Sequence, residues 1–386
     1  MKKHNQDFMK KQNRLTVFEM IKTMHPISRA AIAKETGMSA TTVGRIVGEL
    51  VEEGYIYEAE QDVSAGLGRK STLLNVIDAS VMTVGVEIDL RQIDIGIVDL
   101  RGNLVCGRAY PRQEDESAEQ TIATMGEQIE KLIQEHKLER ARIAGIGIGL
   151  PGIVDHEEGN VAFSVQLGWK NVRVAAMLKE LTGLDTAVDN DLKVMALAEH
   201  LKGAAIGSRR TVLAGFGNGV GSALIVEGEI FRGDLNSAGE IGHTTVDPDG
   251  TLCECGKAGC LQTYINIKSL LLEANKIRPV ANMKDLYQSW SDREGWAVHL
   301  LDRALKYMAI TVNNLVCMYN PDSVIISGEL VEQCPELYER LCELCATHYI
   351  WEPLRGSFQL ARSNPGERSV VIGSGLLSQI RFFRLE

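Results

Sequence analysis

The apolar positions in the first fifty residues recur every three or four positions, which is the spacing of short amphipathic helices. The first such run is Leu15, Phe18 and Ile21. A second helix is predicted over residues 29–36, because Ser28 is a favourable N-cap and Gly37 is a favourable helix stop. A third run follows directly, so three short helices are expected.

The third helix is predicted to begin after Ser39, which can cap it. Its apolar face consists of Val43, Ile46, Val47 and Leu50. The other face carries Thr41, Thr42 and Arg45, short or basic side chains suited to reading base edges in a major groove. Together with the glycine-containing turn over residues 36–42, the pattern is typical of a helix-turn-helix.

Two strand-like runs between residues 55 and 76 flank a glycine-rich loop that carries Arg69 and Lys70. This arrangement resembles the wing of a winged helix. The side chains expected to contact DNA are Ser39, Thr41, Thr42, Arg45, Arg69 and Lys70. Three small helices are also consistent with a packing subdomain that binds nothing, so the helical pattern alone does not decide between the two interpretations.

Charge favours the DNA-binding interpretation. The chain as a whole carries a formal charge of −10, which disfavours general binding to polyanions. Residues 1–50 nevertheless hold nine Lys or Arg against four Asp or Glu, a net of +5, so the remainder carries −15. Any DNA contact is therefore expected at the N-terminus.

The composition is that of a globular α/β protein, with 45% hydrophobic residues, 24% charged residues and 37 glycines among 386. No run reaches the roughly 18 uninterrupted apolar residues of a membrane span, and the polar N-terminus lacks the apolar core of a secretory signal. A cytoplasmic location is therefore expected.

From Val81 onward the pattern changes to strands. Three consecutive strands, with turns at residues 90–91 and 102–103, precede a helix over residues 118–136 and a buried strand that ends in a turn. A second copy of the same order begins near residue 211. This duplication resembles the actin and hexokinase class, so a ribonuclease H-like α/β body with two lobes and a ligand cleft between them is expected.

A specific chemical signal lies between residues 239 and 264. One imidazole and three thiols cluster there: His243, Cys253, Cys255 and Cys260. They form a complete tetrahedral ligand set, so one structural Zn²⁺ per chain is expected, which orders the loop and performs no chemistry. Gly256 and Gly259 permit the sharp turns that such a site needs. The alternative is a chance cluster of four reduced residues.

These elements are similar to those of the ROK family, named for repressors, open reading frames and kinases. Its members carry a GExGH element and a C-x-C-G-x-x-G-C cluster, which are residues 239–243 and 253–260 here. With its helix-turn-helix, the chain resembles the branch of sugar-responsive repressors of the Mlc and NagC type. The resemblance implies a winged helix-turn-helix domain over residues 1–80, a first α/β lobe over 81–190 and a second α/β lobe with the zinc motif over 191–386.

The resemblance also implies a sugar site. ROK kinases hold a hexose with an NDAN motif, of which this chain keeps Asn190 and Asp191 but not the two residues that follow. The family's Asp is a general base; here it would serve as a base or hold a sugar hydroxyl. The implied sugar contacts are Asn190, Asp191, Glu240, His243 and Gln262. Gln262 stands where the family commonly has Glu, so the identity of the sugar stays open.

The ATP side departs further from the kinases. Their first hairpin has the form D-x-G-G-T, because glycine lets backbone N–H groups approach a phosphate closely. Here Asp89 and Leu90 replace the two glycines, so a carboxylate would repel the triphosphate and a side chain would fill its approach. Two hypotheses remain: a repressor that is not an enzyme, or an ATP-dependent sugar kinase with an accessory DNA-binding head.

Several partners follow from the repressor hypothesis. A single helix-turn-helix reads one half-site, so operator DNA would be bound by a homodimer or homotetramer. The inducing signal is a sugar, a sugar phosphate or sequestration to the cytoplasmic domain of a phosphotransferase-system glucose transporter at the inner membrane. The C-terminal run over residues 375–386 suits an oligomer or membrane-proximal contact, or a last helix that packs back on the sheet.

Overall fold

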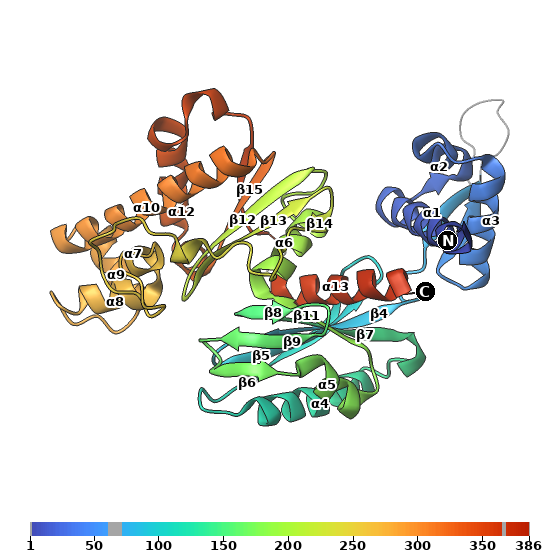
Figure 1. Cartoon of the computed structure of the whole chain (residues 1–386), viewed down its shortest axis with the longest axis horizontal. Coiled ribbons are helices and arrows are strands. Elements are labelled where there is room, and N and C mark those ends of the chain that lie inside the picture. Colours follow the sequence, from blue (N-terminus) through green and yellow to red (C-terminus); the bar gives the residue numbers. More distant parts are fainter. Residues whose placement is uncertain (1, 61–71, 365–367, 386) are drawn as a thin grey trace. The chain divides into compact units, whose positions relative to one another are not determined.

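The structure is a computed structural model that describes residues 2–60, 72–364 and 368–385. The N-terminal part, drawn in blue in Figure 1, contains three helices: α1 (Lys2–Met24), α2 (Arg29–Thr36) and α3 (Ala40–Glu52). A small antiparallel sheet of order β1-β3-β2 completes it, with strands β1 (Ile27–Ser28), β2 (Ile56–Glu60) and β3 (Thr72–Val76). We call residues 2–76 the head. Arg69 and Lys70 lie outside the described residues.

The helix boundaries in the head are set by local capping chemistry. The Ser28 hydroxyl accepts a hydrogen bond from the Ala31 N–H, and α2 ends at Gly37, which has a left-handed φ of 69°. The Ser39 hydroxyl accepts from the Thr42 N–H at the start of α3. Both predicted caps and the predicted bounds of α2 are confirmed. Helix α1 begins at Lys2, earlier than the apolar spacing indicated.

The first large sheet has the strand order β11-β7-β4-β5-β6. Its strands are β4 (Met82–Ile88), β5 (Gln92–Asp99), β6 (Leu104–Pro111), β7 (Ile143–Leu150) and β11 (Thr186–Asn190). Helices α4 (Ala118–Glu135) and α5 (Val174–Thr182) pack on each other beside it. The C-terminal helix α13 (Ser369–Leu385) lies along this sheet (Figure 1), and the Thr83 hydroxyl donates to the Gly375 carbonyl oxygen.

The second large sheet repeats the first, with the order β14-β13-β12-β15-β16. Its strands are β12 (Arg210–Phe216), β13 (Val220–Val226), β14 (Glu229–Ile230), β15 (Ser323–Ser327) and β16 (Gln359–Arg362). In both sheets a three-stranded antiparallel meander comes first, and the strand that follows a helix is added beside the meander's first strand. The duplication predicted from the sequence, and with it the hexokinase-like α/β body, is confirmed.

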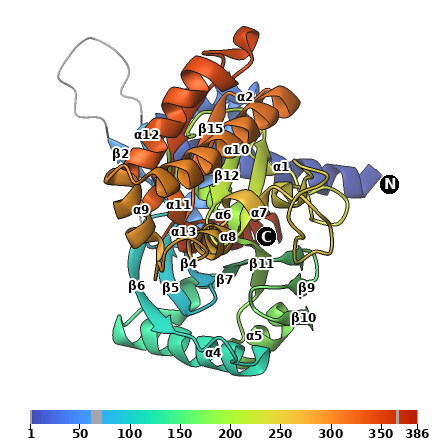
Figure 2. The ribbon, with the colours of Figure 1, turned by 90° about the vertical axis from the view of Figure 1, so that its left-hand side faces the viewer.

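Alternate side chains of β12 face opposite layers, as the period of a strand requires. Val212, Ala214 and Phe216 belong to the large core beneath helix α10 (Gly295–Tyr319). On the other face, Gly215 gives room to Leu192 of helix α6 (Asp191–Lys202), because a Cβ on Gly215 would lie 2.7 Å from that side chain. Figure 2 shows the second sheet with α10 and α12 beside it.

The remaining elements are a small three-stranded sheet of order β10-β9-β8 and a set of short helices and turns. They are strands β8 (Ile153–Asp155), β9 (Asn160–Ser164) and β10 (Trp169–Val172), helices α7 (Gln262–Ile265), α8 (Ile267–Ala274), α9 (Met283–Ser291), α11 (Glu329–Glu332) and α12 (Pro335–Leu344), and the single turns η1 (Arg140–Arg142), η2 (Ile241–His243), η3 (Cys345–Tyr349) and η4 (Glu352–Leu354). Within the described residues, no helix combines the length and the apolar character of a membrane span.

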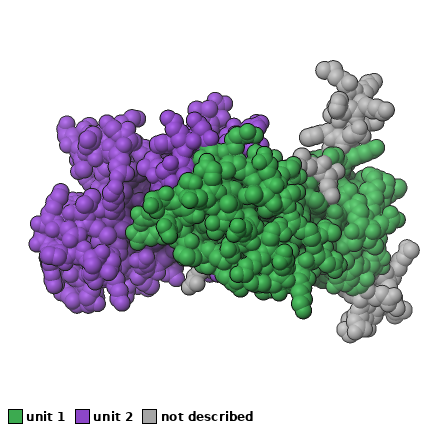
Figure 3. All heavy atoms as spheres, turned by 90° about the horizontal axis from the view of Figure 1, so that it is seen from below, with its two compact units in different colours: residues 1–148, 172–188, 374–386 green, residues 149–171, 189–373 purple. Residues whose placement is uncertain are grey.

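By internal packing the chain divides into two compact units (Figure 3). The first contains residues 1–148, 172–188 and 374–386, so it joins the head, the first large sheet and most of α13. The second contains residues 149–171 and 189–373. The division into three domains, with boundaries at residues 80 and 190, stays a prediction.

Candidate functional site

Helix α3 presents a polar surface on the side away from the core of the head. Its buried residues are Val43, Ile46, Val47 and Leu50. Thr41 and Arg45 are exposed, and the Arg45 guanidinium pairs with Glu49 one turn later, with 2.5 Å between nitrogen and oxygen. The Ser39 and Thr42 hydroxyls lie 2.8 Å apart at the helix start. This face matches the prediction from helical spacing.

The core of the head includes a residue from the far end of the chain. Phe383 of α13 is 8% exposed, and its ring centroid lies 4.6 Å from that of Phe18 and 5.6 Å from that of Tyr55. One turn earlier, Gln379 accepts from Lys22 in α1 and donates to the Asp99 carbonyl oxygen at the end of β5. Helix α13 therefore connects the head to the first large sheet. The sequence suggests an oligomer or membrane-proximal contact, or packing on the sheet, for this segment, but not a contact with the head.

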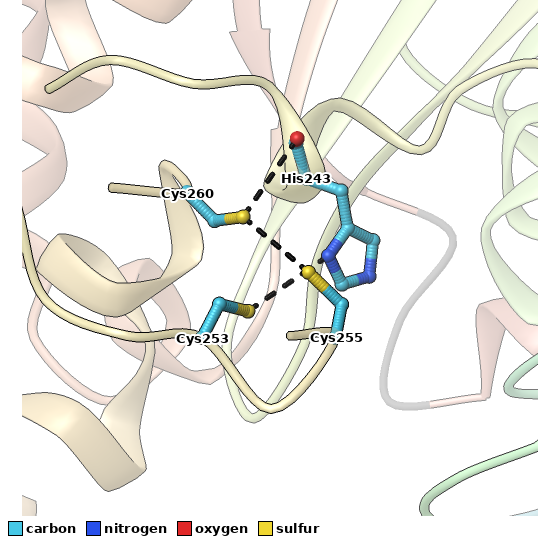
Figure 4. Close-up of side chains that lie close together, drawn as sticks. All are labelled: His243, Cys253, Cys255 and Cys260. Carbon is cyan, nitrogen blue, oxygen red and sulfur yellow. Dashed lines mark hydrogen bonds between the residues drawn. The ribbon is translucent and has the colours of Figure 1, made fainter. Parts of the chain in front are cut away.

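The four predicted metal ligands lie together in the second unit (Figure 4). His243 comes from η2, and the cysteines come from the loop that leads to α7. All four ligand atoms lie within 4.8 Å of one another, with 3.5 Å between the sulfurs of Cys255 and Cys260 and 4.0 Å from the Cys253 sulfur to Nδ1 of His243. Tetrahedral zinc with bonds of about 2.3 Å needs ligand separations of about 3.7 Å. The cluster thus has the size and donor set for a tetrahedral metal ion.

The surroundings of the cluster shift the pKa values of two of its thiols in opposite directions. A hydrogen bond from the Lys257 N–H lowers the pKa of the Cys255 thiol to about 7, whereas burial raises the pKa of the Cys260 thiol to about 12. The Gln262 side-chain amide donates to the Cys253 sulfur at 3.2 Å. Gly256 and Gly259 have φ of 88° and 66°, so the turns that bring the cysteines together do use left-handed backbone.

The residues implied as sugar contacts separate into three groups. His243 and Gln262 belong to the metal cluster. The Asn190 side chain is used in structure, because its oxygen caps α6 at the N–H groups of Leu192 and Lys193 and its amide donates to the Gly152 carbonyl oxygen. The third group is Asp191 and Glu240, whose carboxylates both act electrostatically on the Lys193 ammonium. The Asp191 carboxylate also accepts a hydrogen bond from the Leu192 N–H at 2.8 Å.

Beneath these carboxylates lies a buried polar network that sequence analysis missed. Lys193 is 2% exposed and donates to the backbone and side-chain oxygens of Asn236. Asn236 in turn donates to Asp189, whose fully buried carboxylate pairs with Arg232 at 2.6 Å. Burial lowers the pKa of the Lys193 ammonium, and the carboxylate of Asp189 opposes that effect. The available signal was spacing, since Lys193 precedes the buried Leu197 by one helical turn.

The first hairpin turn of each large sheet is closed by a side chain of the protein. In the first sheet the buried Arg112 donates to the Leu90 carbonyl oxygen at 2.8 Å. In the second sheet Glu329 accepts from the Asn218 N–H at 3.0 Å and from its side-chain amide at 2.7 Å. A Cβ on Gly217 would lie 2.0 Å from the Glu329 carboxylate, so this glycine is needed for a contact within the chain. A carboxylate of the chain thus occupies the turn between β12 and β13.

The model of the ROK family matches residues 83–380, which is most of the chain. The chain belongs to the ROK family. A second model, of winged helix-turn-helix DNA-binding domains, matches residues 26–57, the segment from the start of β1 to β2. The head of this ROK protein is therefore a DNA-binding winged helix-turn-helix.

Curated relatives of similar length are repressors. The xylose repressor of Caldicellulosiruptor bescii is 30% identical over 84% of this chain and 85% of its own length. The DNA-binding transcriptional dual regulator NagC of Escherichia coli is 26% identical over 95% of this chain and 92% of its own. These relatives, together with the winged helix-turn-helix head, indicate a transcriptional regulator.

Solved structures agree on the architecture. A ROK family transcriptional regulator described as a homologue of the E. coli MLC protein covers 98% of both chains, with a TM-score of 0.84 and 23% identity. The ROK hexokinase of Thermus thermophilus covers 78% of this chain and 99% of its own, with a TM-score of 0.69 and 26% identity. The regulator aligns along the head as well as the body, whereas the hexokinase leaves about a fifth of this chain unmatched.

Proposed function

We propose that this ROK protein is a cytoplasmic repressor of genes for sugar uptake or metabolism, which binds operator DNA through α3 and the wing. The observation that carries the proposal is the polar face of α3, with Thr41, Thr42 and Arg45 outward and the apolar face in the core of the head. Ser39 contributes its hydroxyl at the helix start, and Arg69 and Lys70 supply charge for the phosphate backbone.

We further propose that the body receives the inducing signal. Asp191 and Glu240 would hold sugar hydroxyls above the Lys193 network, with Asn190, His243 and Gln262 shaping the site. The relatives named as xylose repressor and NagC support a sugar or sugar phosphate. The other route is sequestration to the cytoplasmic domain of a phosphotransferase-system glucose transporter. One Zn²⁺ per chain at His243, Cys253, Cys255 and Cys260 would order the loop beside this site.

The test begins with selection of duplexes from a randomised pool by the purified full-length chain. Two matching half-sites are expected, bound by a homodimer or homotetramer whose mass light scattering measures. Release from the selected duplex is then measured with xylose, N-acetylglucosamine, N-acetylglucosamine 6-phosphate, glucose and the transporter domain. Failure to enrich any sequence contradicts the repressor function.

A matched pair of variants separates sensing from DNA binding. Asp191→Asn should bind the selected duplex with wild-type affinity but require at least tenfold more of the releasing sugar, because it loses a charged hydrogen-bond acceptor. Glu158→Gln, at an exposed turn between β8 and β9, should respond as wild type. Equal responses of both variants would remove Asp191 from the sugar site.

A further inference from the structure

Helix α3 contains two interior glycines, Gly44 and Gly48, that nothing within the folded chain requires. Neither has positive φ, and a Cβ built on either would meet no atom within 4 Å. Glycine is the least favourable residue after proline inside a helix, because it gives up the most backbone freedom. Alanine at both positions would make the DNA-free head more stable.

Other glycines of the body show the contrast. A Cβ on Gly147 would lie 1.7 Å from the Ser374 carbonyl oxygen, and one on Gly373 would lie 1.8 Å from that of Val194. Close backbone packing therefore explains those two positions. The surface of α3 at Gly44 and Gly48 faces open space, so the reason for glycine there lies outside the chain.

The two glycines lie on the face that meets DNA. Thr41, Gly44, Arg45 and Gly48 follow the spacing i, i+3, i+4 and i+7, which places them on one face of the helix. The buried residues of α3 occupy the opposite face. Thr41 and Arg45 therefore project from a stretch of surface that is otherwise bare backbone.

We propose that Gly44 and Gly48 set how closely α3 approaches the DNA, and that they are specificity-determining residues of the head. This inference rests on the proposed repressor function. Hydrogen bonds to base edges need donor–acceptor distances of about 2.7–3.2 Å. A methyl group between the helix and the groove would hold the helix backbone about 1 Å farther from the DNA. The short Thr41 side chain and the Arg45 guanidinium would then lose their hydrogen bonds to base edges. Contacts of long side chains to phosphates tolerate that displacement.

The test compares wild type with Gly44→Ala, Gly48→Ala and the double variant, all in the full-length chain. Affinity is measured by fluorescence anisotropy, at one salt concentration, for the duplex that wild type selects and for a scrambled duplex. Each alanine should raise the melting temperature by about 2 °C or more, because it favours the helix. Each should also weaken binding to the selected duplex about tenfold or more and leave the scrambled duplex unchanged.

The melting temperature and the affinity for the selected duplex are expected to change in opposite directions. This makes the test decisive, since a loss of binding in a more stable protein is not a folding defect. Gly295→Ala is the control, because Gly295 is also a helical glycine whose Cβ would meet no atom within 4 Å, but it lies in the second unit at the first position of α10. It should leave both affinities at the wild-type value.

Wild-type affinity of the double variant for the selected duplex would overturn the inference, as would a fall in melting temperature together with weaker binding to both duplexes. If wild type selects no sequence, the repressor function itself fails and the inference falls with it.

Discussion

The head and the loop that holds the metal ligands are ordered by opposite means. The head encloses a continuous apolar core that includes Phe18, Ile46 and Leu74, each at most 1% exposed. Along residues 239–260 the buried positions are two glycines and two of the candidate ligands, while Leu252 is 73% exposed. A segment with so little apolar burial needs polar cross-links to hold one conformation, whereas the head does not.

The largest expected effect comes from removing a metal ligand. Structural zinc contributes about 10–16 kcal/mol of binding free energy in small zinc domains, so Cys260→Ser should disorder the loop and abolish stoichiometric zinc. The measurements are metal content by mass spectrometry and tryptic cleavage at the exposed Lys257. Cys317→Ser, at an exposed thiol of α10, is the control and should change neither. If the metal-free wild-type chain resisted cleavage at Lys257, the loop would be ordered without a metal ion, contrary to the contrast drawn with the head.

Phe383→Ala tests the apolar side of the comparison. Removing a buried aromatic ring costs about 3–5 kcal/mol, and here the loss falls on the core between Phe18 and Tyr55. Thermal unfolding of the first unit should shift accordingly and DNA binding should fall, while the metal content should equal that of wild type. Phe231→Ala, at a side chain 49% exposed, is the control. A head that keeps its stability without the ring would show that α13 is not part of its core.

Gln262→Ala tests whether a hydrogen bond to the Cys253 sulfur strengthens metal binding. Its amide donates to the Cys253 sulfur at 3.2 Å, and loss of such a partner typically lowers metal affinity about 10–100-fold. Chelator competition measures the change, with Gln333→Ala at an exposed position as the control. Unchanged affinity would show that the four ligands alone hold the ion.

The smallest effect is expected for an ion pair on the head. Arg14 pairs with Glu53, and both side chains are about a third exposed, so solvent screens the pair. Glu53→Ala should cost less than about 1 kcal/mol of unfolding free energy, as measured by denaturant titration. A cost approaching that of Phe383→Ala would mean that polar links order the head too, and the contrast with the metal loop would disappear.

Features set by interactions between neighbours in sequence could be predicted more accurately than features set by contacts between distant elements. Helix α2 was predicted to the residue because Ser28 and Gly37 act on the backbone a few positions away. The cluster of one histidine and three cysteines could be predicted because its chemistry is visible in the residue types and spacing. The role of Asn190 was less accessible, since its use as the cap of α6 depends on the end of β11 leading directly into that helix.

The local elements, the duplicated order of strands and the donor set of the metal loop could be predicted from the residue pattern alone. Three features become visible only in the folded chain: Phe383 completes the head, Glu329 closes a turn 111 positions earlier in the chain, and Lys193 is buried against Asn236. The physical reason is that caps, turns and periodicity involve neighbours in sequence, whereas these contacts depend on which faces of distant elements pack together. The amino-acid sequence does not show directly which of these faces come together.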